Sequence, residues 1–443
     1  MPGTSACDNT DVFQEGLRLP WLNLYRRGEP VADIVRIIRA NVRIPRMTMG
    51  DINAQIAACN IAERALRELA GRYGSKRLGQ LMTRLVDHTE KVVRAEIAGW
   101  PDGSASFVDY LDSDGIDVAD VRIEVELRVH GDEVTVDLSG TAPMVRGALN
   151  ATRSFTEATV YQAVMSAVSS QIPTTSGAFR PVNIVTTPGT VAHVVMPGAS
   201  TMRGVTGFRI FDAVNGALAQ LIPHRVPAAG EGGNSLAIFA GHAADGEPFI
   251  YFELVVGTWG ARPTADGNDG LCNPAATAAN IPVEVAESEF PIMIECYGLV
   301  PDSGGPGRYR GGLAIERSWR TLVSATTLQV RSDRQNHSPY GLYGGLPGGR
   351  STNELSNGGG PQAYPSMFST TVGEGTLYHH RMAGGGGWGD PLERDPDAVA
   401  ADVRNEKVGA DSAREHYGVL LRSDGSVDET STSELRAARR RKR

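Results

Sequence analysis

The sequence predicts an α+β fold with a large antiparallel β region, a helical hairpin near the N-terminus and short C-terminal helices. Residues 51–97 repeat apolar side chains every three or four positions, residues 121–138 alternate apolar and polar side chains, and short apolar runs follow over residues 182–256. We expect three regions: a helical region over 1–100, a mixed body rich in strands and glycine loops over 101–390, and short helices with a basic tail over 391–443.

The helical hairpin rests on two amphipathic segments. Over residues 51–73 the apolar positions recur at helical spacing, and Gly74 stands where such a helix would end. A second helix is expected from Ser75 to the Gly99-Trp100-Pro101 break. Cys59 lies on the apolar stripe of the first helix, so we expect its thiol to be buried as a small hydrophobic group.

The antiparallel region begins after this hairpin. Apolar and polar side chains alternate strictly over residues 121–129 and 134–138, on either side of Gly131-Asp132. This pattern is typical of a β-hairpin with one apolar face. Helices are expected at 156–167 and 209–221, with short strands between and after them. Further short helices are expected at 398–403 and 412–417, and the basic residues 436–443 are expected to form a solvated, frayed tail.

Charge and composition exclude several classes of protein. The chain has 443 residues, 43 of them basic and 51 acidic, for a net charge of −8, so it offers no overall attraction to nucleic acid or to an anionic membrane. It contains no apolar run of about 20 residues and no signal-peptide pattern. Its four cysteines form no CxxC pair. These features predict a cytoplasmic protein with reduced thiols.

Glycine is concentrated in residues 301–312 and 384–389. Runs of glycine permit positive φ angles or the close approach of another backbone, and we expect them to surround a site or an interface. The second run fits GxGxxG, but Asp390-Pro391 follows it where a dinucleotide site requires a helix. The chain contains no GxxxxGK[ST] phosphate loop, and hence no recognisable ATP site of its own.

Candidate functional residues lie in polar loops. Arg262 is suited to binding a carboxylate or phosphate, and Asp266 could polarise water, although turn and capping roles explain both residues as well. Asp302 and Arg308 belong to the first glycine run, where an internal ion pair or a subunit contact is an equal alternative. His242 and Asp245 are best explained by a hairpin turn, and we predict no metal site.

Several separated motifs, taken together, resemble the hydantoinase B/oxoprolinase family nearly from end to end. They comprise residues 13–20, 50–59, 137–141, 280–284 and 389–392, together with both glycine runs. Glu15 lies in the first motif and completes the candidate set: Glu15, Asp266 and Asp302 as catalytic residues, Arg262 and Arg308 as substrate-binding residues.

The resemblance implies a subunit of an ATP-dependent enzyme that opens cyclic amides such as hydantoins or 5-oxoproline. ATP would be bound by an A-type partner in a hetero-oligomer, which agrees with the missing phosphate loop. The family also implies a divalent metal, with ligands in an N-terminal segment that would precede Met1, so we expect those ligands to be absent from this chain. Two alternatives stay open: a subunit of a ketone carboxylase related to acetone carboxylase, and a shortened, non-catalytic structural subunit.

Overall fold

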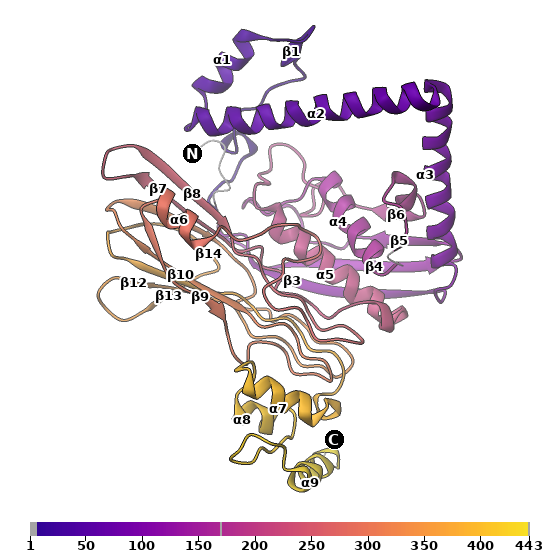
Figure 1. Ribbon diagram of the computed structural model, residues 1–443, viewed down its shortest axis with the longest axis vertical. Helices are drawn as coiled ribbons and strands as arrows, with labels where there is room; N and C mark the ends of the chain where they lie inside the picture. Colours follow the sequence, from indigo (N-terminus) through magenta and orange to yellow (C-terminus); the bar gives the residue numbers. More distant parts are fainter. Residues whose placement is uncertain (1–6, 169–170, 442–443) are drawn as a thin grey trace.

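The computed structural model describes residues 7–168 and 171–441. Figure 1 shows a sheet covered by helices, a β-sandwich beside it, a long helix above both, and a small helical unit at the far end. The predicted α+β class with a large antiparallel region is confirmed. The expected division into regions 1–100, 101–390 and 391–443 stays a prediction.

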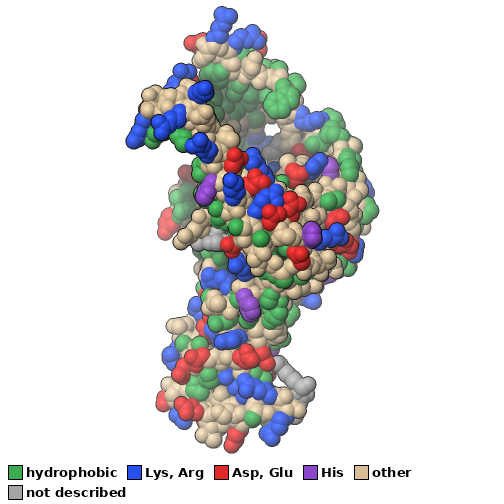
Figure 2. All heavy atoms as spheres, turned by 90° about the vertical axis from the view of Figure 1, so that its right-hand side faces the viewer, with side chains coloured by type: hydrophobic (Ala, Val, Ile, Leu, Met, Phe, Trp, Pro, Cys, Tyr) green, Lys and Arg blue, Asp and Glu red, His purple; other side chains and the backbone are tan. Residues whose placement is uncertain are grey.

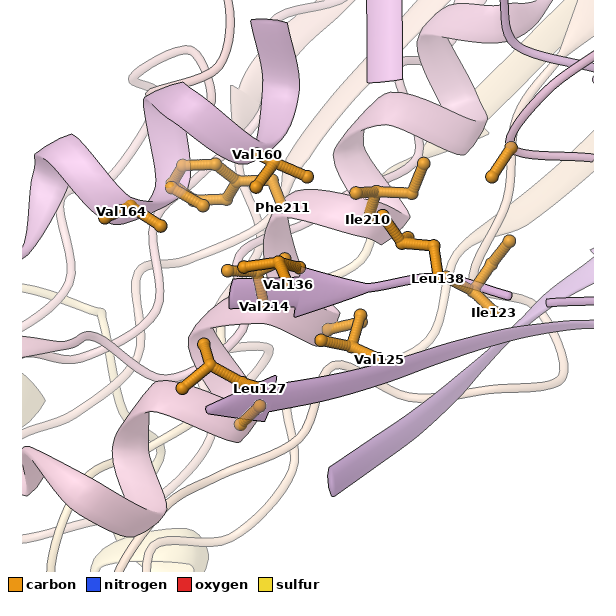
Figure 3. Close-up of a cluster of buried hydrophobic side chains, with 14 of the residues drawn as sticks. Ile123, Val125, Leu127, Val136, Leu138, Val160, Val164, Ile210, Phe211 and Val214 are labelled. Carbon is orange, nitrogen blue, oxygen red and sulfur yellow. The ribbon is translucent and has the colours of Figure 1, made fainter. Parts of the chain in front are cut away.

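The first sheet has the strand order β3-β4-β5-β6, and only the β5–β6 pair is parallel. Its strands are β3 (Gly103–Ser113), β4 (Ala119–His130), β5 (Glu133–Asp137) and β6 (Val182–Val185), so the predicted hairpin is confirmed. Helices α4 (Arg153–Ser166) and α5 (Arg203–Leu221) cover one face. The alternating apolar side chains of β4 and β5 point at these helices and form the main core (Figure 3).

Two antiparallel sheets form the sandwich, with strand orders β14-β11-β7-β8 and β13-β12-β15-β10-β9. Aromatic side chains from both sheets fill the space between them, including Phe239, Tyr251, Trp319 and Tyr378. The strands are β7 (Leu236–His242), β8 (Pro248–Leu254), β9 (Ile292–Leu299), β10 (Ile315–Thr321), β11 (Thr326–Arg331), β12 (Thr352–Ser356), β13 (Gln362–Tyr364), β14 (Met367–Val372) and β15 (Leu377–Arg381). The short helix α6 (Val283–Glu289) precedes β9.

The N-terminal region contains the short strands β1 (Tyr25–Arg26) and β2 (Glu29–Pro30) and helices α1 (Ala32–Ala40), α2 (Pro45–Tyr73) and α3 (Ser75–Ile97). The two predicted long helices are thus present and join at Gly74, whose φ of 76° suits glycine. They meet at an elbow, and α3 then descends along the first sheet (Figure 1). The expected burial of Cys59 is wrong: its thiol is exposed because α2 has no buried residue.

Four glycine-rich loops, residues 256–274, 301–314, 339–351 and 382–391, run side by side below the sandwich and form what we call the glycine layer (Figure 1). A Cβ atom on Gly311 would lie 1.9 Å from the carbonyl oxygen of Gly385, and one on Gly385 would lie 2.1 Å from that of Trp259. The predicted close approach of backbones is therefore confirmed. Positive φ is not the reason for glycine at either position, since neither residue adopts it.

The C-terminal unit contains α7 (Pro396–Arg404), α8 (Ala410–Glu415) and α9 (Glu429–Arg440) around a small core of its own. The predicted frayed tail is wrong for residues 436–440, which belong to α9; residues 442 and 443 lie outside the described part of the chain. Arg436 explains the difference, because its guanidinium donates to the backbone carbonyls of Tyr417 and Arg394. Among the described helices, none has the length and apolar character needed to cross a membrane.

Candidate functional site

A pocket of about 360 Å³ lies where α5 and the turn after it meet the glycine layer. Phe211, Trp259 and several prolines supply the apolar wall, and Asp212, which is buried, also lines the pocket. Three basic side chains also line the pocket: His224 and Arg225, which are exposed, and Arg262, which is half-buried. The pocket therefore joins an apolar wall, a buried acid and a basic edge.

Two hollows of larger volume differ from this pocket in their lining. One, of about 490 Å³, lies at the elbow between α2 and α3, and the other, of about 520 Å³, lies on the outer face of the first sheet. The charged side chains that line them are exposed or half-buried. A pocket with a buried charged group is the stronger candidate for chemistry, because burial changes the acidity of the group.

Behind the pocket, two fully buried arginines hold three aspartates from distant parts of the chain. Arg209 on α5 contacts Asp109 of β3 at 3.1 Å and Asp333, just after β11, at 2.5 Å. Arg334 contacts Asp109 at 3.2 Å and Asp212 at 2.7 Å. The network fixes Asp212 relative to both the first sheet and the sandwich.

Gly232 permits this arrangement. Its φ is 65°, and a Cβ atom there would lie 2.8 Å from Oδ2 of Asp212. A larger residue would be strained and would push the carboxylate away from Arg334. Gly232 therefore helps to position the buried carboxylate of Asp212.

The network contains more carboxyl groups than arginines, and burial raises the pKa values of several of these carboxyl groups. Burial raises the pKa of Glu231 to about 8 and that of Asp333 to about 8, and it raises the pKa of Asp212 well above its ordinary value. Burial opposes the charge of Arg209, yet the neighbouring aspartates raise its pKa. Asp333 is paired with Arg209, whereas the carboxyl of Glu231 accepts from the backbone N–H of Gly233 at 2.8 Å, so Glu231 is the group that we expect to carry a proton at neutral pH.

Of the predicted site residues, Arg262 is the one that lines the pocket. It follows the wall residue Trp259 by three positions, and its guanidinium donates to the backbone carbonyl of Asp266 at 3.0 Å. Its Nε is buried and has no partner among the described residues. The loop thus holds Arg262 at the edge of the pocket with part of its hydrogen-bonding capacity unused.

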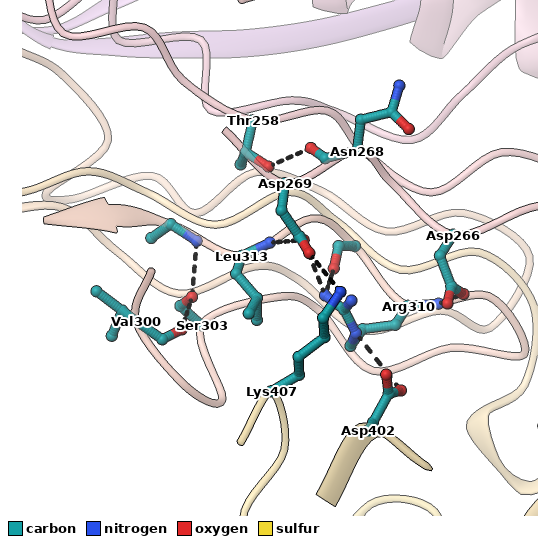
Figure 4. A network of polar contacts seen from close by, with 12 residues as sticks. Thr258, Asp266, Asn268, Asp269, Val300, Ser303, Arg310, Leu313, Asp402 and Lys407 are labelled. Atoms are coloured by element: carbon teal, nitrogen blue, oxygen red, sulfur yellow. Dashed lines mark hydrogen bonds and ion pairs between the residues drawn. The ribbon is translucent and has the colours of Figure 1, made fainter. Parts of the chain in front are cut away.

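Asp266 faces Arg394 instead of the pocket. Arg394 donates to both carboxylate oxygens, at 2.6 and 2.7 Å, and the backbone N–H of Arg310 donates at 2.7 Å. Although burial opposes ionisation, Arg394 holds the pKa of Asp266 below its usual value. Figure 4 shows the adjoining part of this network, where Arg310 and Lys407 meet Asp269. These contacts fit a structural carboxylate better than a general base.

The other three predicted residues also have structural contacts. Asp302 accepts from the backbone N–H of Gly409 at 2.9 Å, at the start of α8. Arg308 lies over the ring of Tyr309, 5.6 Å from its centroid, and its carbonyl accepts from Arg394. Glu15 accepts from backbone N–H groups at the turn before α5, including that of Thr201 at 2.7 Å. The structure thus places Asp266 and Arg308 around one arginine and leaves Asp302 and Glu15 elsewhere.

Local sequence patterns do not predict the buried network as a whole, although one of its charged pairs is recognisable in the sequence. Arg209 and Asp212 are charged residues three positions apart in a helix whose interior is mostly apolar, a pattern that indicates a buried ion pair. Nothing local identifies Asp109 or Asp333 as their partners, because these residues are 100 and 124 positions from Arg209.

A divalent metal does not fit the described residues. Within 7–168 and 171–441, no group of three or more His, Cys, Asp or Glu side chains could hold one. His242 ends β7 and Asp245 lies in the turn before β8, as the predicted hairpin requires. We therefore derive no chemical step through a metal on this chain.

Comparisons with known proteins identify the family to which this chain belongs. Residues 1–391 match the family described as hydantoinase B/oxoprolinase, and the chain belongs to that family. It is 30% identical to the B-type subunit of a putative D-/L-hydantoinase from Pseudomonas sp. (strain NS671), over 97% of this chain and 74% of the relative.

Two further relatives are similar to this chain over nearly its whole length. The crystal structure of the ATP-dependent caprolactamase from Pseudomonas jessenii superposes with a TM-score of 0.89 at 27% identity, over 98% of this chain and 78% of that one. The acetophenone carboxylase delta subunit of Aromatoleum aromaticum is 26% identical over 100% of this chain and 72% of the relative. The resemblance drawn from the sequence motifs is thus confirmed.

Proposed function

We propose that this chain is the B-type subunit of an ATP-dependent cyclic-amide hydrolase in the cytoplasm. Its A-type partner binds ATP and activates the ring amide, and this subunit completes the hydrolysis. The observation that carries the proposal is family membership across residues 1–391, supported by the likeness to a caprolactamase that is ATP-dependent. The absence of a phosphate loop from the sequence agrees with nucleotide binding by a partner.

The pocket supplies a place for the activated substrate. A flat ring would lie against Phe211 and Trp259, and its polar end would reach Asp212. The phosphoryl group on the activated amide oxygen is anionic, and the basic edge formed by Arg225 and Arg262 suits such a group.

Activation explains why two subunits would be needed. The carbon of an unactivated amide is a poor electrophile. Phosphorylation of the amide oxygen makes attack of water on that carbon easier. On this proposal the chain holds the activated ring, orients it, and uses Asp212 to exchange a proton with water or with the leaving group. Burial raises the pKa of Asp212 well above its ordinary value, so this carboxyl holds a proton more readily than an exposed aspartate does.

The test is reconstitution of this chain with the A-type subunit from the same host. ATP hydrolysis and ring opening are measured together with hydantoin, 5-oxoproline and caprolactam as substrates. Ring opening that requires ATP and both subunits supports the proposal. ATP hydrolysis that never couples to the opening of any cyclic amide overturns it.

A second candidate is favoured by the acetophenone carboxylase relative. A carboxylase subunit would form a carbon–carbon bond from bicarbonate and an ATP-activated ketone. Fixation of labelled bicarbonate onto acetone or acetophenone, without ring opening, would select this function over the first.

A further inference from the structure

Charged side chains cover much of the surface of this protein. Figure 2 shows one face of the molecule, on which Lys and Arg side chains lie among Asp and Glu side chains. Groups of this kind are hydrated or paired with one another. A buried side chain with an unused hydrogen-bond donor is more informative, because a ligand can complete it. Asn273 provides such a donor in the pocket between α5 and the glycine layer.

The carboxamide of Asn273 is fixed at one end and free at the other. Asn273 lines the pocket and is 2% exposed, and its Oδ1 accepts from the backbone N–H of Ala275 at 2.8 Å. That contact sets which way the carboxamide points. No described residue accepts a hydrogen bond from Nδ2. Since Nδ2 is not completely enclosed by protein atoms either, its N–H groups face the pocket.

A role in the local turn explains only the oxygen of this side chain. The N–H of Ala275 requires an acceptor two residues before it, and Asp or Ser supplies one in turns of the same kind. Ser would do so without two further N–H donors in a buried position. Ser166, another polar residue of the pocket, illustrates the difference, because its hydroxyl donates to the backbone carbonyl of Ala163. The Nδ2 group of Asn273 therefore remains available to a ligand.

Nδ2 lies beside the buried acid of the pocket. A Cβ atom built on Gly230 would lie 3.8 Å from Nδ2, and the backbone of Gly230 is hydrogen-bonded to the carboxyl of Asp212. Both groups thus lie against one glycine, within reach of a single small ring. The same Cβ atom would lie 2.9 Å from the carbonyl oxygen of Thr258, so glycine is the residue that suits this position.

The chemistry of the pocket favours a neutral acceptor for this donor. An anionic phosphoryl group suits the guanidinium groups of Arg225 and Arg262 at the basic edge. A neutral carboxamide suits a carbonyl oxygen. A simple lactam has one carbonyl oxygen, and activation places the phosphoryl group on it. A hydantoin or a cyclic imide keeps a second carbonyl oxygen free.

We infer that Asn273 determines substrate specificity: its Nδ2 donates to a second, unphosphorylated carbonyl oxygen of the ring, so the pocket selects imides and hydantoins over lactams with one carbonyl group. The inference rests on the proposed function, because it takes the activated ring from it. A bound ring without the second carbonyl covers Nδ2 and leaves it unpaired. Sites with an unpaired buried donor discriminate strongly against such analogues.

Succinimide and pyrrolidinone are matched probes, because both are five-membered rings and they differ in the second carbonyl group. The number of rings opened per ATP hydrolysed is measured for each in the complex reconstituted with the A-type subunit. Asn273→Ser keeps a hydroxyl acceptor for Ala275 and withdraws the donor from the ring. We expect the number to fall by at least about tenfold with succinimide and to change by less than about threefold with pyrrolidinone.

Asn280→Ser is the control, in the same loop. Oδ1 of Asn280 accepts from the backbone N–H of Val256 at 2.8 Å, and its Nδ2 donates to the hydroxyl of Tyr297 at 2.6 Å. Both ends of this carboxamide are thus used within the protein. Asn280→Ser should lower the melting temperature and leave the number of rings opened per ATP unchanged with both probes.

The outcomes separate this inference from the proposed function. If the complex opens rings with ATP but the loss in Asn273→Ser is absent, or equal for the two probes, the role of Asn273 is overturned alone. If Asn273→Ser does not fold, wild type decides: succinimide should inhibit the opening of hydantoin at a concentration at least about tenfold lower than pyrrolidinone does, and equal inhibition overturns the inference. A wild-type complex that opens no ring at the expense of ATP overturns both.

Discussion

Arg334 donates to Asp212 across 2.7 Å and so joins the end of β11 to α5 at the wall of the pocket. Both residues are buried, and the same arginine also meets Asp109 of the first sheet. The acid that we place in the pocket is thereby held by both main bodies of the protein. A change at any of these three residues should affect stability and the site together.

The first prediction concerns the other buried arginine. Arg209→Met removes the cation between Asp109 and Asp333 and leaves the buried Asp333 without its arginine, so the free energy of unfolding should fall by about 3–5 kcal/mol. Arg153→Met, which breaks an exposed pair with Glu157, should change it by less than about 1 kcal/mol. Urea denaturation measures both, and equal effects would contradict the network's role.

The second prediction is a dependence of stability on pH. The pKa of Glu231 is about 8 in the folded protein and about 4.3 in an unfolded chain. Between these values the folded state binds more protons than the unfolded state, so stability should fall as pH rises through this window, by at most about 1.4 kcal/mol per pH unit.

Glu231→Gln keeps an acceptor for Gly233 and removes the titration. Its free energy of unfolding should therefore decline less than that of the wild type between pH 6 and pH 8. Parallel pH profiles for the two proteins would mean that Glu231 is already ionised in the fold.

The third prediction separates structure from catalysis at two of the acids expected to be catalytic. Asp266→Asn weakens the contact with Arg394 and should cost about 1–3 kcal/mol of stability, whereas Asp302→Asn should cost less than about 1 kcal/mol. In both variants kcat/KM per folded molecule should stay within about threefold of wild type. A much larger fall at Asp266 with an unchanged melting temperature would restore it as a catalytic residue.

The fourth prediction tests the glycine layer. A Cβ at Gly385 would meet the carbonyl oxygen of Trp259 at 2.1 Å, which nearby backbone cannot relieve cheaply, so Gly385→Ala should prevent folding or lower the melting temperature strongly. Gly359→Ala is the matched control, because a Cβ there meets nothing within 4 Å. Similar melting temperatures for the two variants would show that the layer is loosely packed.

Local patterns predicted the elements of this fold well. The alternation over residues 121–138 corresponds to β4 and β5, and the helix expected from Arg209 begins six residues earlier, at Arg203. The glycine runs correctly predicted close backbone contact. These features depend on neighbours in the sequence, which is why sequence alone reveals them.

Features that depend on distant contacts were predicted less well. An apolar stripe containing Cys59 looks the same whether it faces a core or a partner, and on α2 it is exposed. Arg436 looks like part of a solvated basic run until Tyr417 and Arg394 offer it carbonyl groups. Among the candidate site residues, Arg262 lines the pocket, while Asp212 became visible as a candidate only through the folded arrangement.

The most direct test of the account is the ratio of ring opening to ATP hydrolysis in the reconstituted complex. Asp212→Asn and Arg262→Ala are compared with wild type, and Glu126→Gln, in the hollow on the outer sheet face, serves as the control. We predict that ATP hydrolysis persists in both pocket variants while ring opening falls by at least about tenfold, and that the control keeps the wild-type ratio. An unchanged ratio in both pocket variants would contradict the claim that this pocket holds the activated ring.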